Sequence, residues 1–446
     1  MNQSSLRYSR LVSHVFAAFL ICLLSPSAIA GEERVTVLAG VTVIDASGRA
    51  PQENVNIVIS GNRIVRISSD IPQSVRSRAG VRILNLPGKY VLPGLWNNHS
   101  HLGDLLPDPK NTLDNEPVLR ASIRAGRNAM DALRAGFTSL RVVGERDYID
   151  VAWKEAFDSG VFVGPRIYPS GAPITDAESD DWLSEAVSGP DEARRAVRDR
   201  AANGVEIIKI IADNMSRDEI GAAVNEAHKH GLRITAHSGD DKSHIAVEFG
   251  VDGIEHGNSL RDETIQLMVE KNVFLDPTIV CNLSADFIAE REQLIASAGY
   301  EYEQSVVDGR VFVSYGDERS SRQAVIARET LVKAANAGVK IISGSDSNPI
   351  DEIGILEIEQ LVFSGLTAMQ AIQAATINSA QMMGVQDDLG TVEAGKLADL
   401  IVLNRNPLEN ISHLRSISMV MKDGFLVNRE TNEGRRSFWD LYFLTD

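Results

Sequence analysis

Hydrophobic positions near the two ends of the chain form short runs rich in β-branched residues, separated by turn sequences. Such runs predict β-strands, because β-branched side chains pack well on a pleated surface. The runs lie at residues 35–38, 41–44, 55–59 and 64–67 near the start and at 400–403, 418–421 and 425–427 near the end. Two similar β-rich ends around a different middle predict one small β-sandwich domain built from both chain ends, residues 31–92 and 388–446.

The middle of the chain alternates strand-like apolar runs with amphipathic stretches of helical period. Eight strand candidates occur, at residues 90–98, 137–143, 164–170, 205–211, 233–237, 253–256, 273–277 and 340–345. One of the intervening helices is predicted to begin at Ser216, in a capping box with Glu219, and to end at Gly231. This alternation predicts an α/β fold, a TIM-type (β/α)₈ barrel over residues 93–387.

The first thirty residues have the pattern of a secretory signal peptide. Arg7 and Arg10 precede an apolar run at residues 11–24, and small residues typical of a cleavage site end at Ala30. A transmembrane anchor is the alternative, but this run is shorter than the ~20 residues that a spanning helix needs. We therefore expect cleavage after Ala30, a periplasmic or secreted protein, and no stable membrane anchor once residues 1–30 are removed.

The charge balance limits the classes of partner. The 446 residues include 44 Lys and Arg against 61 Asp and Glu, a formal net charge of −17. Nucleic acid and anionic membranes bind basic surfaces, so neither is expected as the main partner. With 43% hydrophobic and 24% charged residues, the chain has the balance of a soluble globule. The two cysteines, Cys22 and Cys281, provide no disulfide framework.

Four histidines and one aspartate stand where the predicted barrel strands end. His99 and His101 are two residues apart at the end of the first strand, so both imidazoles can reach a single ion. His237 and His256 end the fifth and sixth strands, and Asp346 follows the eighth. Taken singly, each has an ordinary explanation, such as a core histidine or a helix cap. Because such a barrel carries its active site at the carboxyl ends of its strands, their coincidence predicts a site for Zn²⁺ or a similar divalent ion.

Lys209 interrupts a run of isoleucines in the fourth predicted strand. A lysine in a strand buried on both faces is costly unless it is paired or chemically changed. One interpretation is that the side chain extends to the barrel mouth, where its ammonium group meets water. The other is that it points inward, becomes partly neutral and reacts with carbon dioxide to give a carbamate that bridges two metal ions. Considered alone, the run favours the first interpretation.

Longer motifs extend this pattern beyond single residues. The entry into the first strand reads VLPGLW at residues 91–96, followed by HSHL at 99–102. The sixth strand contains GIEHG at 253–257, and the tail reads LGTVEAGKLADL at 389–400, the most specific of these motifs. With them, nearly the whole chain after the expected cleavage site resembles the amidohydrolase superfamily, and more narrowly its imidazolonepropionase-like and Xaa-Pro dipeptidase-like branch.

The resemblance implies a binuclear metal hydrolase whose ions are most simply Zn²⁺. One ion would be bound by His99, His101 and Asp346, the second by His237 and His256, and both by a carboxylated Lys209. The ions would lower the pKa of a bridging water, and Asp346 would act as general base toward the resulting hydroxide and then as acid toward the leaving amine. Asp346 and Lys209 are thus the implied catalytic residues. The implied substrate is a small-molecule amide, a dipeptide or an N-acyl amino acid.

The chain also departs from this family pattern. Asn97 stands two positions before the first histidine, where the family commonly has aspartate, and this changes the groups that orient His99. Residues 175–181 replace a Gly-Gly-His loop, and Gly239 replaces a histidine or tyrosine. Because the replaced positions tend to contact substrate, the specificity pocket does not match a dipeptidase template.

Three further residues near strand ends are candidates for substrate contact, and packing or surface roles explain them equally well. They are Arg141, Tyr168 and His244. Two alternatives to the cleavage of a linear amide also stay open. One is a hydrolase of cyclic amides, lactones or other esters on the same metal site, and the other is a non-catalytic metal-binding barrel. Barrels of this class often assemble, so a homo-oligomer is an expectation for which the sequence identifies no interface.

Overall fold

The computed structural model describes residues 34–103, 117–179, 183–282, 321–346 and 350–429, and the predicted signal peptide at 1–30 lies outside them. The strands are β1 (Val35–Val43), β2 (Gln52–Ser60), β3 (Arg63–Ser68), β4 (Arg82–Asn85), β5 (Tyr90–Pro93), β6 (Leu95–Ser100), β7 (Phe137–Val142), β8 (Arg166–Tyr168), β9 (Ile174–Asp176), β10 (Glu185–Val187), β11 (Ile207–Ile211), β12 (Arg233–His237), β13 (Gly253–Glu255), β14 (Phe274–Asp276), β15 (Leu400–Leu403), β16 (Ile417–Lys422) and β17 (Phe425–Leu426). The helices are α1 (Gln73–Arg76), α3 (Val118–Arg134), α4 (Ile149–Asp158), α5 (Pro190–Ala202), α6 (Arg217–Lys229), α7 (Asp240–Phe249), α8 (Asp262–Lys271), α11 (Ser321–Ala337), α12 (Ile350–Ser364), α13 (Ala368–Ala374) and α14 (Ile377–Met382). Among the helices of the described ranges, none combines the length and the apolar composition that a bilayer span requires.

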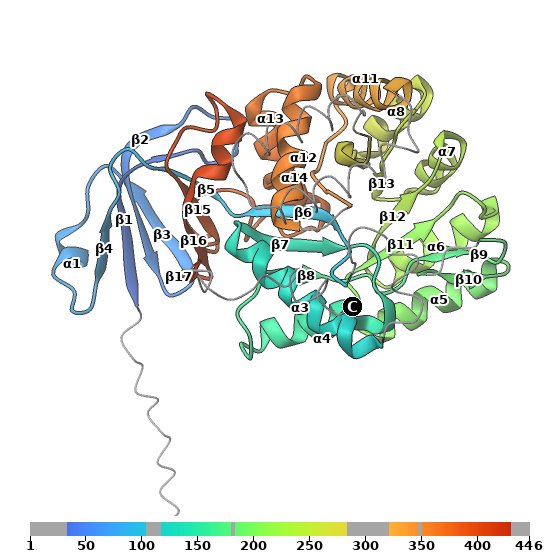
Figure 1. Ribbon diagram of the computed structural model, residues 1–446, viewed down its shortest axis with the longest axis horizontal. Coiled ribbons are helices and arrows are strands. Elements are labelled where there is room, and N and C mark those ends of the chain that lie inside the picture. Colours follow the sequence, from blue (N-terminus) through green and yellow to red (C-terminus); the bar gives the residue numbers. More distant parts are fainter. Residues whose placement is uncertain (1–33, 104–116, 180–182, 283–320, 347–349, 430–446) are drawn as a thin grey trace, which may run out of the picture.

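Strands from both ends of the chain form one mixed sheet, which Figure 1 shows in blue and red beside the parallel strands. Its order is β17-β16-β15-β5-β1-β2-β3, with β4 paired to β1. The C-terminal strand β15 pairs antiparallel with β5, so that Leu400 lies opposite Pro93. Leu38, Ile57 and Leu400 are buried in one apolar cluster on this sheet. Both chain ends thus share one sheet and one core. A second sheet facing it is not assigned among the described strands, so the sandwich itself is not confirmed.

The middle of the chain forms two parallel sheets, β6-β7-β8 and β10-β9-β11-β12-β13-β14. Helices surround these strands in Figure 1, as the alternating pattern predicts for an α/β region. The pair β9 and β10, which the sequence pattern did not predict, is added beside β11. Between the two sheets, the backbone amides of Glu206 and Ile207 donate to the carbonyl oxygen of Pro169 at 2.8 and 3.2 Å.

The eighth predicted strand, residues 340–345, is not assigned as a strand and keeps only an isolated bridge to Leu275. Its backbone groups are divided between neighbours on its two sides. The amide of Ile342 donates to the carbonyl of Leu275, while the amide of Asn98 donates to the carbonyl of Ser343, each at 2.9 Å. The segment is nevertheless not assigned to a regular ladder, and a closed barrel is not detected. The same hydrogen bonds connect β14 with β6.

The helix α6 begins as the sequence predicts. The Ser216 hydroxyl accepts a hydrogen bond from the amide of Glu219 at 3.3 Å, and the Glu219 carboxylate accepts one from the amide of Ser216 at 2.7 Å. This confirms the capping box, which satisfies amides that the first helical turn leaves without partners. Beyond the cap, Ile220, Ala223 and Val224 are buried in the main apolar core between helices and strands.

A buried aspartate ties α4 to the turn that follows β8. The carboxylate of Asp150 accepts hydrogen bonds from the amides of Ser170 and Gly171, at 3.0 and 2.8 Å. Burial raises the pKa of Asp150 from 3.8 to about 6, although these hydrogen bonds act in the opposite direction. The folded chain therefore holds this proton to a higher pH than the unfolded chain does.

We predict that Asp150 makes the fold less stable as the pH rises from about 4 to about 6. A carboxyl whose folded pKa is raised contributes stability below its unfolded pKa, and that contribution is lost as the pH passes the folded value. A shift of about two pKa units corresponds to roughly 3 kcal/mol. We would measure the free energy of unfolding in urea for the wild type and for Asp150→Asn across this range. With rising pH, the wild type should lose stability relative to the variant. A difference independent of pH would contradict the prediction.

Candidate metal centre

Four of the predicted ligand residues meet at the carboxyl ends of the parallel strands. His99 lies in β6 and His101 just after it, His256 follows β13, and Asp346 follows the segment at 340–345. The Nε2 atoms of His99 and His101 lie 3.2 and 3.0 Å from Oδ1 of Asp346, and Nε2 of His256 lies 4.0 Å from its Oδ2. Ligand atoms of His99, His256 and Asp346 all lie within 4.8 Å of one another, which within the described ranges makes them a candidate metal-binding group.

The fifth predicted ligand, His237, lies beside this cluster and nearer to solvent. It ends β12, and its ring packs edge-on against that of His256 with centroids 4.5 Å apart. Its side chain is 40% exposed, and its Nε2 atom lies 3.6 Å from Oδ2 of Asp213. An incoming small molecule would therefore meet His237 before the other imidazoles.

Lys209, the sixth predicted ligand, lies in the middle of β11 and is only 3% exposed. It is therefore buried among the strands and does not extend into water. Burial lowers the pKa of Lys209, although the nearby carboxylates of Glu255 and Asp346 oppose this change. Its charge in turn contributes to lowering the pKa values of His99 and His256, after the larger effect of burial.

Burial keeps the imidazoles in the neutral form that metal binding requires. It lowers the pKa of His99 well below the usual range, and together with the charge of His237 it lowers the pKa of His256 to about 3. For Asp346, burial opposes ionisation, but the facing imidazoles, His99 first, outweigh it and hold the pKa of that carboxyl well below its usual range. Neutral nitrogens beside an ionised carboxylate are the donors that a divalent cation prefers.

A buried ion pair fixes the orientation of His99. Its Nδ1 atom lies 2.8 Å from Oε2 of Glu255, so Nδ1–H donates to the carboxylate and Nε2 faces Asp346 with its lone pair. The guanidinium of Arg141 donates to both oxygens of Glu255 at 2.7 and 2.9 Å, and both side chains are fully buried. A carboxylate behind a ligand histidine sets its tautomer and increases its basicity.

Asp276 is the third member of this buried network. Its Oδ2 atom accepts a hydrogen bond from Arg141 at 3.2 Å. Burial, followed by the charge of Glu255, raises the pKa of Asp276 well above its usual range. Glu255 responds in the opposite way, because Arg141 and Lys209 outweigh the effect of burial and lower its pKa. The pKa values of these two buried carboxyl groups therefore shift in opposite directions.

Sequence reasoning missed Glu255 and Asp276, although both carry a signal. Glu255 is the last residue of β13 and Asp276 is the last residue of β14, and both of these short strands are fully buried. Charged residues in such positions are rarely buried unless they are paired. The signal indicates a partner, but it does not indicate which residue that partner is.

The three residues expected near substrate lie in different surroundings. Arg141 is paired with Glu255 and fully buried, and this burial argues against direct contact with substrate. The ring of Tyr168 stacks on that of Trp96 with centroids 4.9 Å apart, and it lines a cleft beside α3, α4 and β17. His244 lies in α7, where its Nδ1 atom is 3.1 Å from the hydroxyl of Thr264.

Asn97, which stands where the family commonly has aspartate, connects β6 to the segment that leads to Asp346. Its Oδ1 atom accepts hydrogen bonds from the amides of His99 and Ser345, at 3.2 and 3.1 Å. Its Nδ2 atom donates to the hydroxyl of Ser345 at 2.7 Å. The amide thus acts as acceptor and donor at once, a combination that an ionised aspartate lacks.

Three residues of the site have left-handed backbone conformations. The φ angles are 66° at His256, 41° at Thr278 and 49° at Asp346. Such angles are uncommon outside glycine and cost on the order of 1–3 kcal/mol each. The hydroxyl of Thr278 lies 2.6 Å from Nδ1 of His256, so two of these residues are in direct contact. The surrounding structure must hold these conformations for the ligand atoms to converge.

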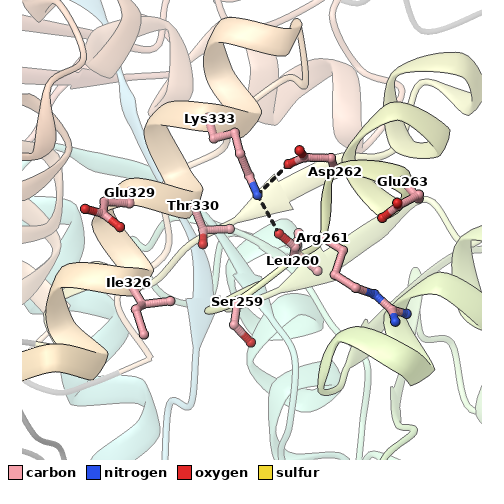
Figure 2. Close-up of a pocket in the computed structure, with 9 residues that line it drawn as sticks. All are labelled: Ser259, Leu260, Arg261, Asp262, Glu263, Ile326, Glu329, Thr330 and Lys333. Carbon is pink, nitrogen blue, oxygen red and sulfur yellow. Dashed lines mark hydrogen bonds and ion pairs between the residues drawn. The ribbon is translucent and has the colours of Figure 1, made fainter.

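A separate pocket between α8 and α11 is not this site (Figure 2). It has a volume of about 500 Å³, and none of the predicted ligands lines it. Figure 2 shows Lys333 between two partners, the carbonyl oxygen of Leu260 at 2.9 Å and the carboxylate of Asp262 at 2.8 Å. This lysine is therefore paired within the wall of the pocket.

Comparisons with known proteins agree with the resemblance carried by the sequence motifs. The model of the Amidohydrolase family matches residues 90–427. Ochratoxinase from Aspergillus niger is 28% identical, over 89% of this chain and 87% of its own length. A crystal structure of a Xaa-Pro dipeptidase with methionine bound in its active site has a TM-score of 0.73 at 28% identity, covering 88% of this chain and 99% of that one. Imidazolonepropionase from Kosmotoga olearia is 22% identical, over 85% of this chain and 92% of its own.

We predict that Gly344→Ala weakens divalent metal binding by about 10-fold or more, in the range found for groups that orient metal ligands. A Cβ atom at Gly344 would lie 2.5 Å from the amide nitrogen of His99 and 2.3 Å from Oδ2 of Asp276, so the site must shift. Equilibrium dialysis against Zn²⁺ measures the effect. Gly239→Ala is the matched control, because the nearest atom to its Cβ is Oδ1 of Asp213 at 3.7 Å. Equal zinc affinity in the two variants would refute the prediction.

Proposed function

This chain belongs to the amidohydrolase family and is a hydrolase that acts on carbon–nitrogen bonds, and on that premise we propose that it cleaves the amide bond of a dipeptide or an N-acyl amino acid. The observation that carries the proposal is the convergence of His99, His101, His256 and Asp346 at the carboxyl ends of parallel strands. The Xaa-Pro dipeptidase among the solved relatives supports a dipeptide-sized substrate. A TIM-type barrel, closed through residues 340–346, is part of the proposal.

The donor set fits two divalent ions, and we assign Zn²⁺ to both positions. One would be held by His99, His101 and Asp346, the other by His237 and His256, with a carboxylated Lys209 between them. The lowered pKa of Lys209 supports the carbamate, because only a neutral amine has the lone pair that attacks carbon dioxide. Bound there, the ions would activate a water molecule and polarise the scissile carbonyl group.

Asp346 is the residue that we assign to move the proton. Its Oδ1 atom faces His99 and His101, whereas Oδ2 lies 3.6 Å from Sγ of Cys281 and 4.0 Å from Nε2 of His256. In hydrolysis the hydroxide of the attacking water bonds to the carbonyl carbon and the C–N bond breaks. The water's proton passes through Oδ2 of Asp346 to the leaving nitrogen, which departs as the amine.

The Glu255–Arg141 pair acts behind this chemistry. By accepting the Nδ1 proton of His99, Glu255 keeps Nε2 available as a donor toward the metal position. Arg141 keeps Glu255 ionised in a place where burial alone would favour its protonated form.

For the cellular location, we propose that residues 1–30 direct export and are removed after Ala30, so that the enzyme acts on small amides in the periplasm or outside the cell.

We predict that hydrolysis depends on both the metal and Asp346. Removal of divalent ions by a chelator should abolish activity, and added Zn²⁺ should restore it. Asp346→Asn should lower kcat by about 10² to 10⁴-fold, the range for loss of a general base. Lys209→Met should reduce the zinc content per chain, measured by elemental analysis. Activity that is indifferent to the chelator and to Asp346→Asn would favour a non-catalytic barrel and a contaminating enzyme.

A substrate panel separates the amide hydrolase from its closest alternative. We predict that dipeptides and N-acyl amino acids are hydrolysed with kcat/KM values above those of matched cyclic amides and lactones. Liquid chromatography that follows loss of each substrate and formation of its hydrolysis product measures this directly, because lactones release no amine. Matched esters of the same acids serve as the control for acyl-group binding. Turnover confined to lactones or esters would replace the proposed substrate class.

A further inference from the structure

A buried carboxyl group from the helical layer reaches the turn that follows β14. Glu357 lies in α12 and is fully buried. Its Oε1 atom accepts a hydrogen bond from the amide of Ile279 at 3.0 Å, and Oε2 accepts one from the amide of Val280 at 2.9 Å. These amides open the short 3₁₀ turn Ile279–Asn282. Each oxygen of the Glu357 carboxyl group thus accepts a hydrogen bond from one backbone amide that would otherwise be buried without a partner, at a cost in free energy.

The inner side of the same turn touches two of the proposed metal ligands. The hydroxyl of Thr278 lies 2.6 Å from Nδ1 of His256, and Sγ of Cys281 lies 3.6 Å from Oδ2 of Asp346. Thr278 and Cys281 are both buried. A single turn therefore contacts Glu357 on its outer side and both ligands on its inner side.

The turn also contains a conformation that needs support. Thr278 has a φ of 41°, which is a genuine outlier for a β-branched residue. The two backbone amides that donate to Glu357 belong to the residues directly after Thr278. The Glu357 carboxyl group therefore holds the chain where it leaves the strained conformation. Without that anchor the turn could relax, and the Thr278 hydroxyl would move relative to His256.

Glu357 lies in surroundings that disfavour a carboxyl group without a hydrogen-bonding partner. Burial raises the pKa of Glu357 to about 8, against the two backbone hydrogen bonds and the charge of Arg328. Arg328 itself donates to Gln360 at 3.2 Å, one turn further along α12. A carboxyl group in such a place costs stability relative to an apolar side chain of similar volume unless it has a specific partner. The specific partner here is the turn.

We propose that Glu357 is a positioning residue of the metal centre: from the helical layer it fixes the turn after β14 and thereby sets His256 and Asp346. It touches neither the proposed substrate nor the ions, and it acts through Thr278 and Cys281. The tests of this inference by zinc affinity and by activity rest on the proposed function. The placement of the turn by Glu357 does not depend on that function.

Glu357→Gln tests the proposal with little change of volume. In the variant, an NH₂ group replaces one of the two acceptor oxygens. This NH₂ group cannot accept a hydrogen bond from the backbone N–H that it faces. We expect zinc affinity to fall by about 10-fold or more, and kcat to fall while KM stays within about twofold. Gln360→Ala is the matched control, since Gln360 is also buried on α12 and its contact is with Arg328 rather than with the turn. Zinc affinity and kcat should stay near the wild-type values in this control.

A second readout does not depend on any metal. In metal-free protein, the rate at which a small thiol reagent modifies Cys281, followed by peptide mass spectrometry, reports how tightly the turn is held. We expect labelling to be at least several-fold faster in Glu357→Gln than in the wild type or in Gln360→Ala. If the wild type neither binds zinc nor hydrolyses amides, the proposed function fails and this test still stands. Wild-type labelling rates in folded Glu357→Gln would overturn the positioning role.

The wild type alone provides a third test, should Glu357→Gln fail to fold. The amides of Ile279 and Val280 lie outside the regular helices and sheets, yet the proposal requires them to be hydrogen-bonded. We expect their hydrogen exchange to be as slow as that of the amides in β14. Exchange at the rate of solvent-exposed amides would show that Glu357 does not hold the turn.

Discussion

Charged groups inside the layer of parallel strands must be paired there, and the candidate metal centre is arranged around that constraint. Arg141, Glu255 and Asp276 come from three different strands and are fully buried, so water cannot compensate any of them. Burial opposes the ionisation of Glu255, but the charges of Arg141 and Lys209 outweigh it, whereas burial and the charge of Glu255 raise the pKa of Asp276. The Oε2 atom of Glu255, which also accepts a hydrogen bond from Arg141, accepts the one from Nδ1 of His99. The orientation of a proposed metal ligand thus follows directly from the need to neutralise a buried arginine.

A second constraint acts on the backbone. The left-handed conformations at His256, Thr278 and Asp346 aim side chains from adjacent strand ends at a common point, and such conformations persist only where neighbours hold them. Segments from different layers supply that support: Asn97 from β6 holds the segment before Asp346, and Glu357 from α12 holds the turn after β14. The site is therefore built from the strand ends but kept in shape by groups behind them.

Local patterns were sufficient for much of the fold and for the identity of the proposed ligands. The capping box at Ser216 and Glu219 depends on residues three apart, so the sequence contains all the information needed to predict it. The strand predictions agree with β12 at residues 233–237 and come within two residues of the start of β11. At residues 340–345 only an isolated bridge forms, because whether an apolar run becomes a ladder depends on neighbouring segments that its own sequence does not specify. The short pair β9–β10 was missed because its three-residue strands have no distinct period.

The sequence by itself determined which chemistry is present: imidazoles two residues apart at one strand end, further histidines and an aspartate at others, and a lysine within an apolar strand. These features are local, and family motifs reinforce them. Only the tertiary structure decided which other residues orient these side chains. Glu357 and Ile279 are 78 residues apart in the chain, and His99 and Glu255 are 156 apart. Partners at such separations are set by the register of the sheets and the packing of helices on them, and no local pattern specifies either. The same physics explains why Arg141, a candidate for either substrate contact or packing, is the buried partner of Glu255.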